Sequence, residues 1–327
     1  MRAAVISEPG GPDVFRIEDI EEPVIGPEDV LVDVKATALN RADLLQRRGR
    51  YNGPPGTRDD LPGLEMAGVV ASVGERVYDV FPGDRVFGLL GGGGYAQRVA
   101  THHRMVATIP NHMSFTDAAA VPEVFITAYD ALFNQCTLSM GDAVLIHAAG
   151  SGVGTAAIQL AHCAGAMTFG TASSAEKLSK AADLGLDVGI NYQNQDFAEV
   201  VKEQTYGHGV DVILDVIGAS YWDRNLASLV PQGRMVIVGT MSGATLETNL
   251  GVLMGKRLQV RGTTLRARPL EEKIFLAQQF NNHVLPLLED GRARSVVDSV
   301  FPLEEVSDAH RYMESNANFG KIVLSME

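Results

Sequence analysis

The strongest structural signal in the chain lies in residues Val144–Ala161, which read Val-Leu-Ile-His-Ala-Ala-Gly-Ser-Gly-Val-Gly-Thr-Ala-Ala-Ile-Gln-Leu-Ala. The pattern predicts a short buried strand, a glycine-rich turn and a helix that begins at Val153 or Gly154. A dinucleotide needs this arrangement, because glycines let backbone N–H groups approach a pyrophosphate and a helix N-terminus favours negative charge. The glycines are spaced G-x-G-x-G instead of the usual G-x-G-x-x-G, so an ordinary tight turn is the alternative.

The segment from 123 to 264 alternates between expected strands and expected helices, which indicates a parallel sheet. The strands are expected at 143–147, 167–171, 188–191, 210–215, 234–239 and 258–262, and the helices at 153–165, 174–184, 195–205, 221–229 and 249–255. Six strands with right-handed crossovers make a complete Rossmann sheet, whose ligands bind at the carboxyl ends of the strands.

The end of the second strand indicates which nicotinamide cofactor is bound. Enzymes that use NAD usually have an acidic residue there, which holds the ribose 2′-hydroxyl. This chain has Ser173 and Ser174, with Lys177 one helical turn later, and these groups suit a 2′-phosphate. The alternative to a 2′-phosphate site is that the serine only caps the helix and the lysine is exposed to solvent. The nearby acidic residue Glu176 leaves NADH open as the cofactor. The pattern favours NADPH over NADH, and Tyr192 is a candidate either to contact the adenosine or to pack its loop.

Residues 1–122 are β-rich with frequent Gly and Pro turns, and they predict an irregular antiparallel barrel. One helix is expected at 40–49, with Asn40 as N-cap and Gly49 as the stop. Two roles are open for Asn40 and Asp43. They either stabilise the helix start, as its N-cap and as an acidic residue in its first turn, or take part in the chemistry of a functional site.

The tail after residue 265 contains a helical run at 270–290, a helix through Met313 that includes His310, and a last strand at 320–325. His310 is expected to be a surface or packing residue. Since the Rossmann sheet already has six strands, the last strand is expected to return to the first domain. The predicted domains are therefore 1–122 with 265–327, and 123–264.

The composition describes a globular protein, with 46% hydrophobic and 20% charged residues among 327. No apolar run is long enough to span a bilayer, and the first residues read as a strand instead of a signal peptide. Cys136 and Cys163 offer no disulfide framework and fit a reducing cytoplasm. The net charge of −13 argues against a broad nucleic-acid surface.

Several long motifs occur in order along the whole chain. They are Asn40–Gly49, Gly63–Val70, Pro82–Val86, Ser151–Leu160, Gly218–Trp222 and Gly320–Leu324. In these motifs the chain resembles the medium-chain dehydrogenase/reductase superfamily and, within it, the zinc-independent quinone oxidoreductases. The resemblance implies an α/β fold in which a doubly wound Rossmann domain is joined to a discontinuous GroES-like catalytic domain.

The resemblance also bears on metal binding. Zinc-dependent members carry Gly-His-Glu where this chain has Gly63–Glu65, and Leu64 has no lone pair to offer. A cysteine ligand is expected where Asn40–Asp43 stand, and two cysteines are too few for a structural zinc loop. Zinc requires three or four ligands in fixed geometry, which Glu65 and Asp43 alone do not supply. No metal is predicted.

The resemblance further implies that Asn40, Asp43 and Tyr51 line the substrate cleft beside the nicotinamide. Asn40 would donate through its amide, and Tyr51 would donate through its phenol or act as a lid. Asp43, which cannot donate when ionised, would orient Asn40 or a water. The residues expected to contact the cofactor are Tyr51, Thr127, Ser151, Gly152, Val153, Gly154, Ser173, Lys177, Tyr192, Ile217, Gly239, Thr240, Leu265 and Asn318.

These observations predict a metal-free, NADPH-dependent reductase that transfers a hydride to a quinone or a conjugated carbonyl. One alternative is a reductase of small enones or enoyl groups. Another is a non-enzymatic protein that binds NADPH or RNA, which would need basic and aromatic residues interleaved. The candidates for such a surface are Arg47-Arg48, Arg50-Tyr51, and Arg266 with Arg268. The apolar edge strand 258–262 predicts a homodimer, because an open edge invites pairing with a second copy.

Overall fold

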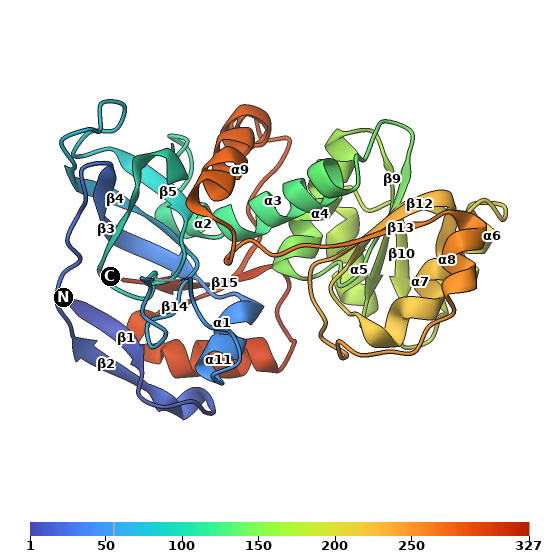
Figure 1. The fold of residues 1–327 in the computed structure, drawn as a ribbon, viewed down its shortest axis with the longest axis horizontal. Coiled ribbons are helices and arrows are strands. Elements are labelled where there is room, and N and C mark those ends of the chain that lie inside the picture. Colours follow the sequence, from blue (N-terminus) through green and yellow to red (C-terminus); the bar gives the residue numbers. More distant parts are fainter. Residues whose placement is uncertain (55, 327) are drawn as a thin grey trace. The chain divides into compact units, whose positions relative to one another are not determined.

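The computed structural model describes residues 1–54 and 56–326, which form two compact units. The first unit comprises Met1–Ile126 and Leu265–Glu327, and the second comprises Thr127–Thr264 (Figure 1). The first boundary falls four residues after the expected one at 122, because helix α3 (Pro122–Tyr129) continues across that point. The tail from Leu265 onward belongs to the first unit, which is therefore discontinuous in sequence.

The second unit is built on a six-stranded sheet in the order β10-β9-β8-β11-β12-β13, and every neighbouring pair is parallel. The strands are β8 (Ala143–Ile146), β9 (Met167–Ala172), β10 (Val188–Asn191), β11 (Val210–Asp215), β12 (Leu229–Ile237) and β13 (Gln259–Gly262). In the middle of the sheet, Leu145 lies opposite Phe169 on one side and Ile213 on the other. This strand order is the Rossmann order, so the predicted fold is confirmed.

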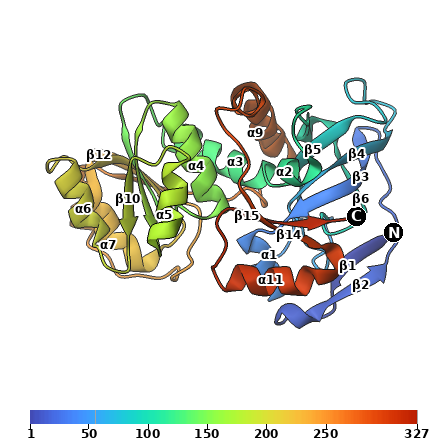
Figure 2. The same ribbon diagram turned by 180° about the vertical axis from the view of Figure 1, so that it is seen from behind.

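Helices cover both faces of this sheet (Figure 1). They are α4 (Gly152–Cys163), α5 (Ala175–Ala182), α6 (Phe197–Gln204), α7 (Trp222–Ser228) and α8 (Leu250–Lys256). One buried cluster joins Phe169 and Ile213 of the sheet to Phe197 of α6 and Leu226 of α7, with Leu253 of α8 at its border. Helices α4 and α5 lie on the opposite side of the strands, as both views show (Figures 1 and 2).

Strand β12 begins five residues before the expected position at 234. Pro231 and Gly233 resemble a turn in the sequence, yet Leu229 already pairs with Val210 of β11. The register then shifts between Val210 and Val212, which accommodates the irregular residues within the strand.

The first unit contains a seven-stranded sheet in the order β14-β15-β3-β4-β5-β7, with β6 also paired to β3. Its strands are β3 (Asp29–Ala38), β4 (Glu65–Val73), β5 (Arg85–Leu89), β6 (Arg98–His102), β7 (Val106–Thr108), β14 (Val297–Pro302) and β15 (Lys321–Ser325), beside the hairpin of β1 (Arg2–Ile6) and β2 (Phe15–Asp19). An irregular antiparallel barrel was expected for residues 1–122, and the strands of the large sheet that come from those residues do pair antiparallel. Within the described residues the sheet does not close, and it is mixed because the crossover through α11 (Val306–Glu314) makes β14 and β15 parallel.

The other helices of this unit are α1 (Arg41–Arg47), α2 (Phe115–Ala119), α9 (Leu270–His283) and α10 (Leu285–Glu289). The single helical run expected at 270–290 is therefore two helices. The first ends before Pro286, because proline cannot donate a backbone hydrogen bond inside a helix.

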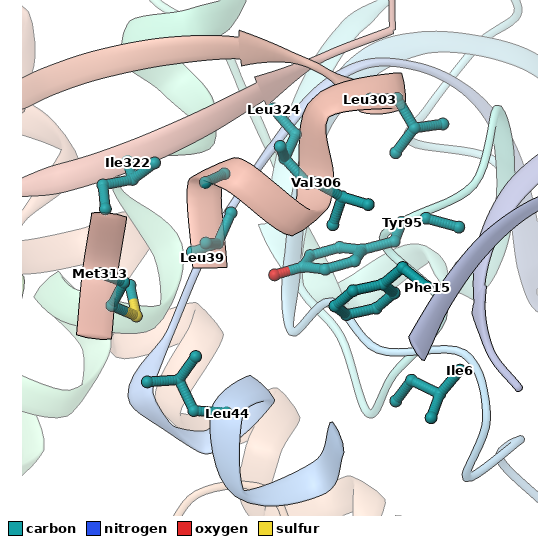
Figure 3. Packing of buried hydrophobic residues seen from close by; sticks show 12 residues of the cluster. Ile6, Phe15, Leu39, Leu44, Tyr95, Leu303, Val306, Met313, Ile322 and Leu324 are labelled. Atoms are coloured by element: carbon teal, nitrogen blue, oxygen red, sulfur yellow. The ribbon is translucent and has the colours of Figure 1, made fainter. Parts of the chain in front are cut away.

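The core under α1 brings distant parts of the first unit together. Leu39 and Leu44 at the start of the helix pack with Tyr95 and with Ile322 and Leu324 of the last strand (Figure 3). Helix α11 contacts β14 and β15 and adds further apolar side chains to this core (Figure 2). Among the described residues, no helix is both long enough and apolar enough to cross a membrane.

Candidate functional site

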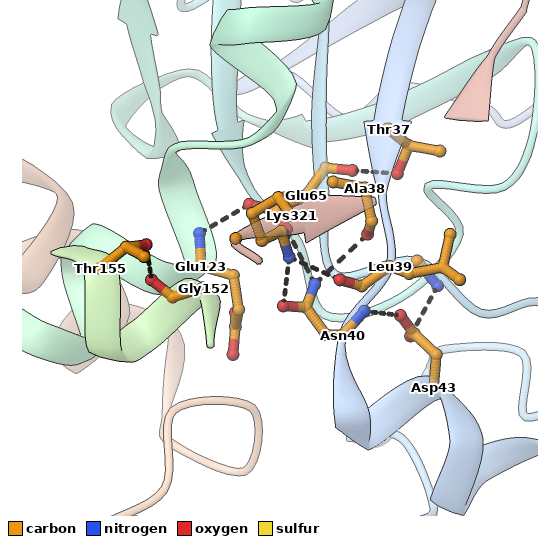
Figure 4. Close-up of polar contacts among 12 residues, drawn as sticks. Thr37, Ala38, Leu39, Asn40, Asp43, Glu65, Glu123, Gly152, Thr155 and Lys321 are labelled. Carbon is orange, nitrogen blue, oxygen red and sulfur yellow. Dashed lines mark hydrogen bonds and ion pairs between the residues drawn. The ribbon is translucent and has the colours of Figure 1, made fainter. Parts of the chain in front are cut away.

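Helix α1 begins after Asn40, as expected, and the Asn40 amide is fully engaged inside the first unit (Figure 4). Its Nδ2 group donates to Glu65 Oε1 at 2.8 Å and to the Ala38 carbonyl at 3.3 Å. Its Oδ1 accepts from Lys321 Nζ at 2.6 Å. Because both amide hydrogens already have acceptors, Asn40 holds its neighbours in place here. Donation to a substrate would require one of these bonds to be exchanged.

Glu65 and Lys321 form a buried ion pair beside Asn40, with 2.7 Å between Oε1 and Nζ. Lys321 also donates to the Leu39 carbonyl at 2.6 Å, and Glu65 Oε2 accepts from the Glu123 backbone N–H at 2.8 Å. A buried pair is tolerated when such additional bonds satisfy both charges. Neither residue was expected to be functional. The available signal was a single charge in each of two otherwise apolar strands.

Asp43 is fully buried and is held from three directions. Its carboxylate accepts from the Asn40 backbone N–H at 2.7 Å, from the Gly63 N–H at 3.3 Å and from the Tyr95 hydroxyl at 3.1 Å. Burial raises the pKa of Asp43 to about 6, against these hydrogen bonds and the charge of Lys321. Asp43 therefore orients Asn40 through the backbone of the helix start.

His310 continues this network into the core of the first unit. Its Nε2 lies 3.3 Å from the Tyr95 hydroxyl, and its Nδ1 lies 3.2 Å from Nη1 of Arg47, which can only donate. The ring is fully buried and packs edge-on to Phe15. Burial lowers the pKa of His310 to about 3, so the ring is neutral. Of the two alternatives expected for His310, a surface residue or a packing residue, the structure shows the second.

Glu123, near the start of α3, is a half-buried carboxyl beside this cluster. Its pKa is raised to about 8, first by burial and then by the charge of Glu65. Figure 4 shows its carboxyl directed away from Glu65, and no described residue forms a hydrogen bond with it. Burial raises the pKa of the Tyr51 phenol, and the charges of Glu123 and Asp43 add to that shift. The cluster therefore offers a protonated carboxyl and a phenol near each other.

Replacing Glu123 by glutamine should increase stability relative to the wild type as the pH rises from about 5 to about 9. Between the ordinary pKa of 4.5 and the raised value of about 8, the unfolded chain releases a proton that the folded chain retains. The free energy of unfolding of the wild type therefore falls as the pH rises through this range. Glu123→Gln has no carboxyl at this position, so its stability lacks this pH dependence. The measurement is the difference in Tm between variant and wild type at each pH. Glu203→Gln, at an exposed position of α6, is the control, and a pH-independent difference for Glu123→Gln would contradict the assignment.

The glycine-rich turn of the second unit leaves little room for a side chain. Ser151 caps α4 by accepting the Gly154 N–H at 3.0 Å. A Cβ atom at Gly154 would lie 2.3 Å from the Ala148 carbonyl oxygen. Ala148 itself has a φ of +53°, which is uncommon for a residue with a side chain. The helix start is thus packed closely against the turn, which is the close approach of backbone to backbone that a pyrophosphate-binding turn uses.

A buried polar network supports the same edge of the sheet. Asp215, at the end of β11, accepts from the backbone N–H groups of Ile217 at 2.7 Å and Gly218 at 3.1 Å. It also accepts from Asn225, whose Oδ1 lies 2.7 Å from Nε2 of His147. Burial lowers the pKa of His147 to about 4. This network fixes the loop that contains Ile217, and no local pattern indicates that His147, Asp215 and Asn225 meet.

The remaining cofactor candidates lie mostly at the carboxyl ends of the parallel strands. Ser173 and Lys177 are half-buried after β9, and it is Ser174 that caps α5, by accepting the Lys177 N–H at 3.3 Å. Tyr192 is 42% exposed after β10. Gly152, Val153 and Gly239 are half-buried, Thr240 is exposed and Thr127 is buried in α3. Tyr51, Leu265 and Asn318 belong to the first unit.

Comparison with known proteins identifies the family. Residues 26–111 match the description "Alcohol dehydrogenase GroES-like domain", and residues 152–282 match "Zinc-binding dehydrogenase". The quinone oxidoreductase of Lama guanicoe is 33% identical over 330 residues, which cover 100% of this chain and 98% of that protein. The chain belongs to the medium-chain dehydrogenase/reductase family of oxidoreductases.

Solved structures of similar proteins share the whole fold. The Escherichia coli quinone oxidoreductase complexed with NADPH matches with a TM-score of 0.88 and 31% identity, over 99% of this chain and 100% of that chain. The CurK enoyl reductase matches with a TM-score of 0.88 and 31% identity, over 100% of this chain and 99% of that chain.

Proposed function

We propose that this protein is an NADPH-dependent reductase of quinones or conjugated carbonyls that works without a metal ion. The observation that carries the proposal is the carboxyl edge of the parallel sheet. No acidic residue ends β9, and Ser173 and Lys177 follow it. The similarity to quinone oxidoreductases, one of them complexed with NADPH, favours the same chemistry.

The turn around Ser151 and Gly154 would hold the pyrophosphate, and Ser173 with Lys177 would hold a 2′-phosphate. Ile217, on the loop anchored by Asp215, would border the nucleotide. NADPH, when bound, supplies a hydride. The chain contributes orientation and hydrogen-bond donors to the oxygen on which charge develops.

Tyr51 is the proposed donor to the acceptor oxygen, because its phenol keeps its proton at neutral pH. Glu123 is the proposed proton source, since the proton at its carboxyl is retained at neutral pH. Asn40 and Asp43 act as positioning residues, because their polar atoms are already engaged with Glu65, Lys321 and the helix backbone.

The donor atoms near Asn40 do not suit zinc. Leu64 has no ligand atom, and both oxygens of Glu65 accept hydrogen bonds or an ion pair. Both oxygens of Asp43 are likewise occupied. Among the described residues, no group of three His, Cys, Asp or Glu side chains is arranged to hold a metal ion. The proposed reaction therefore relies on side-chain donors.

A second candidate is an enoyl or enone reductase, which the likeness to the CurK enoyl reductase favours. Quinones and enones present the same conjugated electrophile, so steady-state rates on ortho- and para-quinones and on alkenals would separate them. The assay should use protein dialysed against a chelator, with its zinc content measured. Turnover that depends on stoichiometric zinc, or absence of nucleotide binding in calorimetry, would overturn the proposal.

An RNA-binding function has less support in the structure. Arg47 and Arg266, two of the basic residues considered for an RNA surface, are buried at 0% and 3% exposure. Arg47 bonds to the Gly10 carbonyl, His310 and Glu314. A gel shift with and without NADPH tests this candidate.

Lys177→Ala should weaken NADPH binding by about 1–3 kcal/mol, the scale of a charge-assisted hydrogen bond, and should affect NADH much less. The reason is that only NADPH carries the 2′-phosphate. Dissociation constants for both nucleotides are measured by calorimetry. Lys180→Ala, one turn further along α5 at an exposed position, is the matched control. Equal losses for the two nucleotides in Lys177→Ala would exclude the 2′-phosphate role.

A homodimer through residues 258–262 is also proposed. Strand β13 is an edge strand with β12 as its neighbour, and most of its side chains are exposed. Leu250 and Met254 of the preceding helix α8 are 63% and 77% exposed, which adds apolar surface beside that edge. Light scattering that gives the mass of a single chain would contradict the dimer. A cytoplasmic location is proposed with it, and Cys136 and Cys163 form no disulfide among the described residues.

A further inference from the structure

The first unit contains a cavity of about 430 Å³, which is large enough for a small organic group. Its wall is formed by the loops around Thr57 and Gly91 and by the segment that leads into α9. Two basic side chains, Arg268 and Lys273, belong to this wall, and no acidic residue does. The chain as a whole carries a net charge of −13, so a basic cavity is unusual for it.

Lys273 is 8% exposed and lies in the first turns of α9. No ion pair or hydrogen bond joins its ammonium group to any described residue. Its pKa is lowered, first by burial and then by the charge of Arg266. A largely buried lysine without an ion-pair partner is costly, because charged side chains are almost never buried unless they are paired.

Arg266 lies beside Lys273 and is 3% exposed. Its Nε donates to the Gly91 carbonyl at 2.9 Å, and its Nη1 donates to the Tyr51 carbonyl at 3.0 Å. Its Nη2 is buried and, within the described residues, has no hydrogen-bond partner. The guanidinium also lies over the Tyr51 ring, 5.2 Å from the ring centre. Arg266 therefore connects the wall of the cavity to Tyr51.

The charges around Arg266 do not neutralise this pair of cations. Asp43, Asp59 and Glu123 are close enough to raise the pKa of Arg266, but none of them forms an ion pair with it in the described part of the chain. Burial has the larger effect and lowers the pKa of Arg266. Two neighbouring cations with unused donors are suited to an anion, since a buried donor left unsatisfied costs free energy that a ligand would recover.

We propose that this cavity is an anion subsite, in which Lys273 in the wall binds the carboxylate or sulfonate of an organic acceptor and Arg266, behind the wall, adds positive charge. The proposal rests on the proposed function, in which Tyr51 contacts the reducible carbonyl, and it narrows the substrate class to acceptors that carry a negative charge. Arg266 joins Tyr51 to Gly91 of the cavity wall, so in this proposal the charged substituent of an acceptor at Tyr51 extends toward the cavity.

The test compares 1,4-naphthoquinone with 1,4-naphthoquinone-2-sulfonate in the wild type and in Lys273→Met. The ratio of kcat/KM for the sulfonate to kcat/KM for the neutral quinone should fall about tenfold or more in the variant, as expected for loss of a charge-assisted hydrogen bond. Lys202→Gln, which removes one charge at an exposed position of α6, is the control and should leave this ratio unchanged. The Tm of Lys273→Met should not fall, because the variant removes an unpaired buried charge.

A second measurement separates this inference from the proposed function. Calorimetry with naphthalene-2-sulfonate, which cannot be reduced, should show binding to the wild type that weakens about tenfold or more in Lys273→Met. If neither quinone is reduced but this binding is lost in the variant, the proposed function fails and the anion subsite stands. If the ratio and the binding are both unchanged, the subsite is excluded. A loss of NADPH affinity in Lys273→Met without a change in the ratio would assign the cations to the cofactor instead and would also overturn the proposal.

Discussion

Lys321→Met should lower the free energy of unfolding of this protein by about 3–5 kcal/mol. The substitution removes the ammonium that pairs with Glu65 and leaves the carboxylate in the core at 0% exposure. It also removes the donor to Asn40 Oδ1 and to the Leu39 carbonyl. A buried charge without its partner is far more costly than the pair itself, because the desolvation cost is no longer offset.

The measurement is urea denaturation followed by a probe in the first unit, since a chain of two compact units need not unfold in one step. Lys202→Met is the control. Its ammonium lies on α6 in an exposed pair with Glu199, and its loss should change stability by no more than about 0.5 kcal/mol. The double variant Glu65→Gln with Lys321→Met should recover part of the loss, because no charge is left unpaired. Equal stability of Lys321→Met and the wild type would show that the pair contributes nothing.

Gly154→Ala should damage the glycine-rich turn, with a loss of about 1–3 kcal/mol in stability and at least about a tenfold loss in nucleotide affinity. The added Cβ would lie 2.3 Å from the Ala148 carbonyl oxygen and 2.9 Å from backbone atoms of Ala149. These are main-chain atoms, so the helix start must move away from the turn. Such a movement would displace the backbone N–H groups that we propose bind the pyrophosphate.

Gly255→Ala is the matched control, since it makes the same chemical change in a helix of the same unit. A Cβ at Gly255 would meet nothing within 4 Å, and the substitution should gain up to about 1 kcal/mol in stability. Stability is measured by thermal unfolding, and affinity is measured by calorimetry with NADPH. If Gly154→Ala binds the nucleotide as well as Gly255→Ala does, the turn is not the pyrophosphate site.

The parallel sheet could be predicted because its strands and helices alternate with clear periodicities. Leu145 and Ile213 come from short apolar runs, and their length and their regular alternation with helical segments favour buried strands. The early start of β12 could not be predicted, since Pro231 and Gly233 are typical of a turn. The open, mixed arrangement of the other sheet was also beyond prediction, because it depends on which strands pair and not on where strands occur.

The polar cluster could be predicted only in part. Asn40 and Asp43 are three residues apart at a helix start, so local rules place them together. Glu65 and Lys321 are separated by 256 positions, and nothing in either strand indicates its partner. Arg266 was considered as a possible contact for RNA, but the structure buries it against Gly91 and Tyr51. Local sequence patterns predict where helices and strands occur. Which distant charged residues form pairs depends on the tertiary structure.

The position of β15 has a consequence for how the chain folds as it is synthesised. The ribosome completes residues 127–264 before it adds β14 and β15, which the first unit needs to finish its sheet. The second unit can therefore fold early, while the first waits with Glu65 unpaired and part of its core exposed. During that interval the nascent chain presents an unfinished β-sheet edge at β3, which is the stage at which a molecular chaperone would be most useful.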